Sequence, residues 1–220
     1  MGWRDGLSFD TKEPISRFAE SLQVPEGHTL LLQDELAIQA NVEEALALWL
    51  TKRVTKDSIV FFYFAGHARA NSTTGEIFLM PYDTTPQSSL TRLISLRVLQ
   101  KRLLNLGARL VVAIIDAPVA MDAAAKNSTI RHAAPNWIGD LDGSAKVGTG
   151  TIIQVSSRRP LSQTHQSFLS GLTGKADLDK DGTVSVGEWL RSLLPIAVTA
   201  PTLPPALSIQ SIPLSHVTRP

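Results

Sequence analysis

Cysteine is missing from this 220-residue chain. Its absence excludes disulfide bonds, metal sites built on thiolates and any cysteine nucleophile. It does not point to one cell compartment, because a cysteine-free chain folds equally well in reducing and in oxidising surroundings.

Long apolar runs and an excess of one charge sign are missing as well. No run approaches the ~20 apolar residues that a membrane-spanning helix needs, and the opening MGWRDGLSFD has no apolar core of a secretory signal. The net charge of +1 gives no electrostatic reason to expect binding to nucleic acid or to an acidic membrane. We therefore expect a cytoplasmic protein that associates with neither.

The chain does contain enough apolar sequence to build a core. Hydrophobic residues make up 43% of the chain and charged residues 19%, which are proportions typical of globular proteins. At this length the sequence predicts one well-packed domain, with or without a tail.

Strand and helix patterns alternate along the chain. Asn41 followed by Glu44 resembles a capping box, and Ser95 is placed to cap a helix that Gly107 ends. Strands are expected at 28–33, 58–67, 76–80, 109–116 and 150–156, and helices at 14–22, 41–53, 95–105, 166–174 and 186–195. This alternation predicts an α/β fold with a mostly parallel sheet and helices on both faces.

Two of the expected strands end in residues that can do chemistry. One ends in AGHA with His67, and another ends in DAP with Asp116. In parallel sheets, functional residues gather where loops leave the carboxyl ends of the strands. Each residue also has a structural interpretation: His67 as a packed strand-end histidine, and Asp116 as the cap of a turn.

Several segments around these residues resemble one enzyme family. In chain order, DSIVFFYFAGHA, EIFLMPYD and LVVAIIDAPVA are similar to the caspase-like cysteine peptidases, especially metacaspases and bacterial caspase homologues. Pro118 follows His67 by 51 residues, close to the roughly 50 residues between histidine and cysteine in caspases. The resemblance extends to ADLDKDGTVSVGEWL and covers roughly residues 10–212.

The resemblance assigns a role to each strand-end residue. It implies that His67 stands at the general-base position, Asp116 in the pocket for a basic substrate residue, and Pro118 at the nucleophile position. Proline has no thiol to activate. It also lacks the backbone N–H that this family is expected to use for the oxyanion, a loss worth about 10²–10³ in rate. We therefore expect a catalytically inactive pseudopeptidase that binds or regulates a peptide or protein, such as an active homologue.

Two features leave alternatives open. A hydrolase with a non-cysteine nucleophile would preserve activity, although no G-x-S-x-G motif is present. The family also begins with an apolar strand at the centre of its sheet, and nothing before residue 10 resembles it. Either the chain is a fragment, or its first central strand is missing from a remodelled sheet.

A second motif predicts a metal site near the C-terminus. DLDKDGTVSVGE, residues 177–188, fits the calcium-loop pattern D-x-D-x-D-G-x₅-E, with Gly182 at the sharp turn. The expected Ca²⁺ ligands of this EF-hand-like loop are Asp177, Asp179, Asp181, Thr183 through its carbonyl, Ser185 and Glu188. The alternative is a polar Asp/Gly turn without metal. A third hypothesis for the whole chain is calcium sensing alone.

These motifs divide the sequence into three expected parts. Residues 1–165 form the caspase-like α/β domain, truncated at its N-terminus. Residues 166–197 form a helix–loop–helix around the calcium loop. Residues 198–220 form a Pro-rich tail.

Overall fold

The computed structural model describes residues 19–117, 119–121, 152–156, 170–193 and 213–216. The chain divides into two compact units. One, the strand unit, comprises residues 32–157. The other, the loop unit, comprises residues 1–31 together with 158–220. The fold is a mixed α/β arrangement with small sheets, and none of the described helices is long and apolar enough to cross a bilayer.

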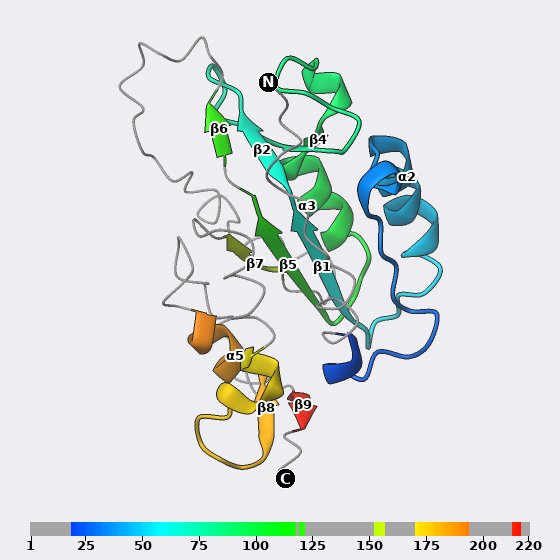
Figure 1. The fold of residues 1–220 in the computed structure, drawn as a ribbon. Helices are drawn as coiled ribbons and strands as arrows, with labels where there is room; N and C mark the ends of the chain where they lie inside the picture. The colour runs from blue at the N-terminus through cyan, green and yellow to red at the C-terminus, as the bar shows by residue number, and fades with distance from the viewer. Residues whose placement is uncertain (1–18, 118, 122–151, 157–169, 194–212, 217–220) are drawn as a thin grey trace. The chain divides into compact units, whose positions relative to one another are not determined.

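The strand unit contains a parallel sheet of β1 (Ile59–Ala65), β5 (Leu110–Asp116) and β7 (Ile152–Ser156), with β5 in the middle. Figure 1 shows β1 and β5 side by side. Leu110 and Val112 of β5 are fully buried, as expected for a parallel strand covered on both faces. The strands predicted at 58–67, 109–116 and 150–156 are therefore confirmed, although β1 ends at Ala65.

A second sheet makes the prediction of a mostly parallel sheet too simple. It has the order β4 (Ile94–Ser95), β3 (Ile77–Met80), β2 (His67–Ala70) and β6 (Val119–Met121). Only the β2–β6 pairing is parallel; β2–β3 and β3–β4 are antiparallel.

The antiparallel pairing of β2 and β3 has a local cause in the turn that joins them. Asn71 donates its N–H to the Glu76 carbonyl at 2.8 Å, and Gly75 donates to the Asn71 carbonyl at 2.8 Å. Gly75 has a φ of 70°, which suits glycine better than any residue with a side chain. A turn this short can only return the chain as an antiparallel strand.

The helix expected after the second sheet is confirmed. It is α3 (Leu96–Leu104), and the Ser95 side chain accepts a hydrogen bond from the Val98 N–H at 3.2 Å. Leu99 and Leu103 are buried in the core of the strand unit. Gly107, at a φ of 67°, follows the helix as predicted.

The helix expected at 41–53 starts earlier than predicted. α2 (Gln39–Glu44) begins after Ile38 and continues as a π-helical segment, η2 (Ala45–Trp49). Asn41 therefore lies inside the helix, where its amide donates to the Leu36 carbonyl at 3.0 Å. The prediction of a capping box with Glu44 was wrong because the Asn41 side chain bonds backward along the chain.

The strand expected at 28–33 is not formed. Its first three residues are exposed, including Leu30 at 43%, and it belongs to none of the strand pairings of the described residues. An apolar run becomes a strand only where a neighbouring strand satisfies its backbone groups. Of the helix expected at 14–22, residues 19–21 are helical, and 14–18 lie outside the described residues.

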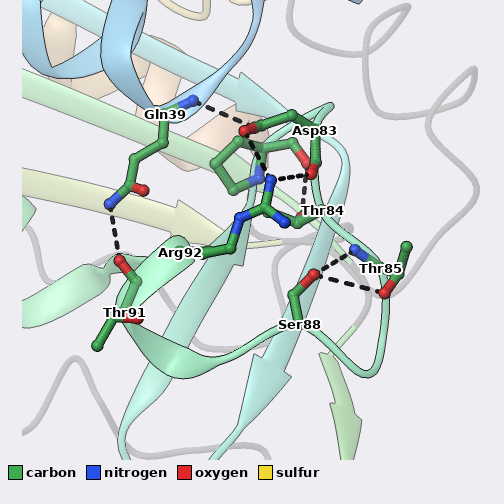
Figure 2. Close-up of polar contacts among 8 residues, drawn as sticks. Gln39, Asp83, Thr84, Thr85, Ser88, Thr91 and Arg92 are labelled. Atoms are coloured by element: carbon green, nitrogen blue, oxygen red, sulfur yellow. Dashed lines mark hydrogen bonds and ion pairs between the residues drawn. The ribbon is translucent and has the colours of Figure 1, made fainter.

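An exposed polar cluster joins the start of α2 to the 81–92 loop (Figure 2). Arg92 donates to the Asp83 carbonyl at 2.8 Å and to its carboxylate at 3.2 Å. Gln39 donates its N–H to Asp83 at 3.3 Å and its amide to the Thr91 carbonyl at 3.2 Å. A 3₁₀ turn, η3 (Leu90–Arg92), ends this loop, and another, η1 (Asp34–Leu36), precedes α2. The cluster holds a loop and carries no sign of a ligand.

The described part of the loop unit contains η5 (Gly171–Lys175), β8 (Thr183–Ser185), α5 (Val186–Leu193) and β9 (Pro213–His216). Trp189 of α5 is fully buried. A Cβ on Gly171 would lie 2.9 Å from the Trp189 ring, so glycine is needed for this close approach. The helix predicted at 186–195 is confirmed from its first residue. Residues 166–169 of the helix before it lie outside the described residues. Residue 170 and η5 are helical except at Gly174, where φ is 116°.

A strand forms within the segment that the sequence predicts to be a tail. β9 pairs with β8 in antiparallel register, Thr183 opposite His216 and Val184 opposite Ser215. The three-part division of the chain at residues 165 and 197 stays a prediction. β9 is one of the described strands that the sequence did not predict, as are β4 and β6.

Candidate metal centre

The acidic loop at residues 177–188 is shaped by its own carboxylates. Gly182 donates its N–H to the Asp177 carboxylate at 3.2 Å, and Asp181 donates to Asp179 at 3.1 Å. Lys180 and Gly182 both have a positive φ, 63° and 88°, which turns the chain sharply between the acidic residues. Glycine at position 182 meets this requirement at low cost.

The loop ends in a capping box at the start of α5. Ser185 accepts a hydrogen bond from the Glu188 N–H at 3.3 Å, while the Glu188 carboxylate accepts from the Ser185 N–H at 3.0 Å. The Ser185 hydroxyl also donates to that carboxylate at 2.8 Å. This reciprocal pair satisfies backbone donors of the first helical turn, and it fixes the position of Glu188.

Glu188 also reaches back to the beginning of the loop. Its second oxygen accepts the N–H groups of Leu178 at 2.9 Å and Asp179 at 3.3 Å. The Glu188 residue is only 6% exposed. Burial acts to raise the pKa of Glu188, but the hydrogen bonds from Ser185, Leu178 and Asp179 favour the ionised form and lower the pKa below its ordinary value.

Three carboxylates converge in this loop. Asp177, Asp179 and Glu188 each offer an oxygen, and these oxygens all lie within 4.8 Å of one another. Calcium binds oxygens at 2.3–2.6 Å, so two ligands of one ion lie up to about 5 Å apart. The spacing therefore fits a single cation of that size.

One oxygen of the triad lacks a hydrogen-bond partner. Asp177 Oδ1 is buried, and no donor of the described residues bonds to it. A buried carboxylate oxygen without a partner is costly, and a cation bound between the three carboxylates would satisfy it. A polar turn without metal would leave this oxygen without a partner among the described residues.

The remaining predicted ligands lie in the same loop but outside the triad. Asp181 is exposed and accepts the Thr183 N–H at 2.7 Å. Thr183 and Ser185 are the first and last residues of β8. The triad could thus hold a metal ion, with Thr183 and Ser185 on the strand that follows and Asp181 in the turn before it.

The strand-end residues lie in the strand unit, at the ends of neighbouring strands. Ala65 of β1 is opposite Asp116 of β5, and His67 follows β1 by two residues as the first residue of β2. His67 is partly buried, and this burial lowers its pKa below the ordinary value. Pro118 lies outside the described residues.

Sequence reasoning missed the backbone partners of the loop. The N–H groups that hold Glu188 belong to Leu178 and Asp179, and a motif defined by side chains does not show them. It also missed β9, which pairs with the predicted ligand segment. The sequence PLSH at 213–216 has no alternation of apolar and polar residues that would have predicted this strand.

No protein-family model matches this chain, and no curated protein of significantly similar sequence was found.

Proposed function

We propose that residues 177–188 bind one Ca²⁺ ion. The observation that carries this proposal is the convergence of one carboxylate oxygen each from Asp177, Asp179 and Glu188 within 4.8 Å. The buried Asp177 Oδ1, which has no hydrogen-bond partner among the described residues, supports it. The donors are oxygens, which favours hard cations over zinc or copper. Mg²⁺ requires a rigid octahedron and retains several waters, so a protein loop rich in carboxylates favours calcium.

The proposed calcium ligands are of two kinds. Asp177 and Glu188, from opposite ends of the loop, and Asp179 provide the carboxylates; Asp181, Thr183 and Ser185 are the further ligands proposed. Ser185 holds Glu188 in place through a hydrogen bond from its hydroxyl to the carboxylate. A bound Ca²⁺ would offset the repulsion among these carboxylates and link the two ends of the loop.

Calorimetric titration of the purified full chain with CaCl₂ tests the proposal. We expect one ion per chain, and we expect the heat to be lost in Glu188→Gln. Glu44→Gln removes the same charge from an exposed position of α2 in the other unit and should bind as the unchanged protein does. Equal heats for Glu188→Gln and the unchanged chain would overturn the proposal, and tighter binding of MgCl₂ would overturn the choice of calcium.

A second proposal concerns the strand unit, which we propose to be a caspase-like pseudopeptidase domain that binds a peptide or protein, such as an active homologue. The register of Ala65 with Asp116 and of Ala68 with Val119 supports it. Both pairings bring the chain around His67 next to the chain on either side of residue 118. In this proposal His67 is a vestigial base, and Asp116 receives a basic side chain.

Peptidase assays test that second proposal. Peptides ending in arginine or lysine should not be cleaved, with or without calcium, because proline offers no nucleophile. Turnover that disappears in His67→Ala but persists in His28→Ala, an exposed histidine, would overturn it. Labelling by a serine-directed covalent probe would favour a hydrolase with a different nucleophile. Pro118→Cys should restore labelling by thiol-reactive peptide probes, and no labelling would argue against the family geometry.

A further inference from the structure

The strand β9 pairs with the last part of the acidic loop. β8 consists of residues 183–185, the seventh to ninth positions of the loop, and β9 pairs with it along its length. Thr183 is opposite His216, Val184 opposite Ser215 and Ser185 opposite Pro213, with an irregularity between Val184 and Ser185. β9 therefore lies directly against the half of the loop that follows the sharp turn.

This pairing orders the backbone that the metal site uses. Thr183 is expected to act through its carbonyl, so its orientation depends on the backbone of β8. Ser185 fixes Glu188 by two hydrogen bonds to the carboxylate. Val184 between them is fully buried, so the strand cannot rotate without losing its packing. A partner strand that fixes β8 thus fixes ligands before the ion arrives.

The coupling also runs from the metal ion to β9. Ion binding would hold the carboxylates of Asp177 and Glu188 together across the loop and so order β8, which would then present a fixed edge to β9. Two binding events that order the same segment assist each other, and the assistance is equal in both directions.

We propose that β9 is a calcium-coupled latch: its docking on β8 strengthens calcium binding by residues 177–188, and calcium holds β9 in place. This inference rests on the proposed calcium function. In this proposal the edge of β8 binds an extended peptide strand, because β9 of the same chain pairs with it as a strand.

Two truncated chains separate the latch from the metal site. A chain ending at Ile212 lacks β9, and a chain ending at His216 keeps it and serves as the matched control. We expect calcium affinity about tenfold weaker for the first, within the range of about 5–150-fold typical of coupled sites, and unchanged for the second. A synthetic peptide of residues 211–218 added to the shorter chain should recover the lost affinity.

The outcomes distinguish the two proposals. Equal calcium affinity in both truncated chains overturns the latch and leaves the calcium site standing. Absence of calcium binding in the full chain overturns the calcium site, and the latch with it.

A measurement on the full chain covers the case in which the shorter chain does not fold. Amide hydrogen exchange at Leu214, Ser215 and His216 should slow by about tenfold when calcium is added, since the same coupling governs both directions. Glu188→Gln should abolish this change, and Glu44→Gln should retain it. Exchange at these amides that does not respond to calcium would overturn the latch.

Discussion

Residues 177–188 and the strand-end residues collect their chemical groups in different ways. The loop takes all of its carboxylates from twelve consecutive residues and holds them with hydrogen bonds inside the same segment. His67 and Asp116 come from strands that are far apart in the chain, and sheet register places Asp116 opposite Ala65, two residues before His67. The loop depends on local geometry, and the strand ends depend on the assembly of the whole strand unit.

The two regions also differ in chemical completeness. In the loop, three carboxylates converge and one buried oxygen still lacks a partner. At the strand ends, the nucleophile position given by the family resemblance is a proline. The loop therefore keeps the carboxylates that its proposed role needs, whereas the strand ends lack the nucleophile that the resemblance implies.

The largest loss of stability is expected from a substitution in the buried packing of α5. Trp189→Ala removes a fully buried indole and should lower the free energy of unfolding by about 3–5 kcal/mol. Calcium binding should be lost as well, because α5 carries Glu188. Urea denaturation measures the first effect and calorimetry the second.

The matched control lies in the strand unit. Leu103→Ala also empties a fully buried position and should cost about 2–5 kcal/mol. If the loop geometry depends only on contacts within the loop unit, this variant keeps calcium binding in conditions where it remains folded. Loss of calcium binding in folded Leu103→Ala would show that the loop depends on the strand unit.

A smaller effect is expected from the Glu188 carboxylate without metal. Glu188→Gln replaces an acceptor of four hydrogen bonds by an amide whose NH₂ group faces N–H or O–H donors. In the presence of a chelator we expect a loss of about 1–3 kcal/mol in unfolding free energy, measured by urea denaturation. A variant as stable as the unchanged chain would show that the carboxylate serves only the metal.

The pH dependence of the unfolding free energy tests the same stabilisation by the Glu188 carboxylate. The pKa of Glu188 is lowered in the folded protein from its ordinary value of 4.5, so the unfolded chain takes up the proton first. The stabilisation from this carboxylate is present above about pH 4.5 and is lost as the pH falls through the lower, folded pKa. In chelator, the stability difference between the unchanged chain and Glu188→Gln should shrink over that interval. A stability difference that stays constant with pH would contradict the stabilising role of the ionised Glu188 carboxylate.

Features that depend on local contacts could be predicted from the sequence, whereas features that depend on distant contacts could not. The cap of α3 at Ser95, the start of α5 and the acidic loop were all predictable, because each depends on residues a few positions apart. The antiparallel position of β3 and the absence of a strand at 28–33 were not. β9 was missed for the same reason: a strand is defined by its partner, and its partner lies about 30 residues away in the chain.

The smallest effect tests whether burial, rather than the number of hydrogen bonds, separates the loop from an ordinary polar cluster. Asp83 accepts from Arg92 and from Gln39, much as Glu188 accepts from its neighbours (Figure 2). Its side chain is 37% exposed and that of Arg92 is 54% exposed, so water can replace the lost bonds. Asp83→Asn should therefore cost only about 0.2–1 kcal/mol in urea denaturation, and less still in high salt. A loss as large as that of Glu188→Gln would mean that exposure does not explain the difference between the two regions.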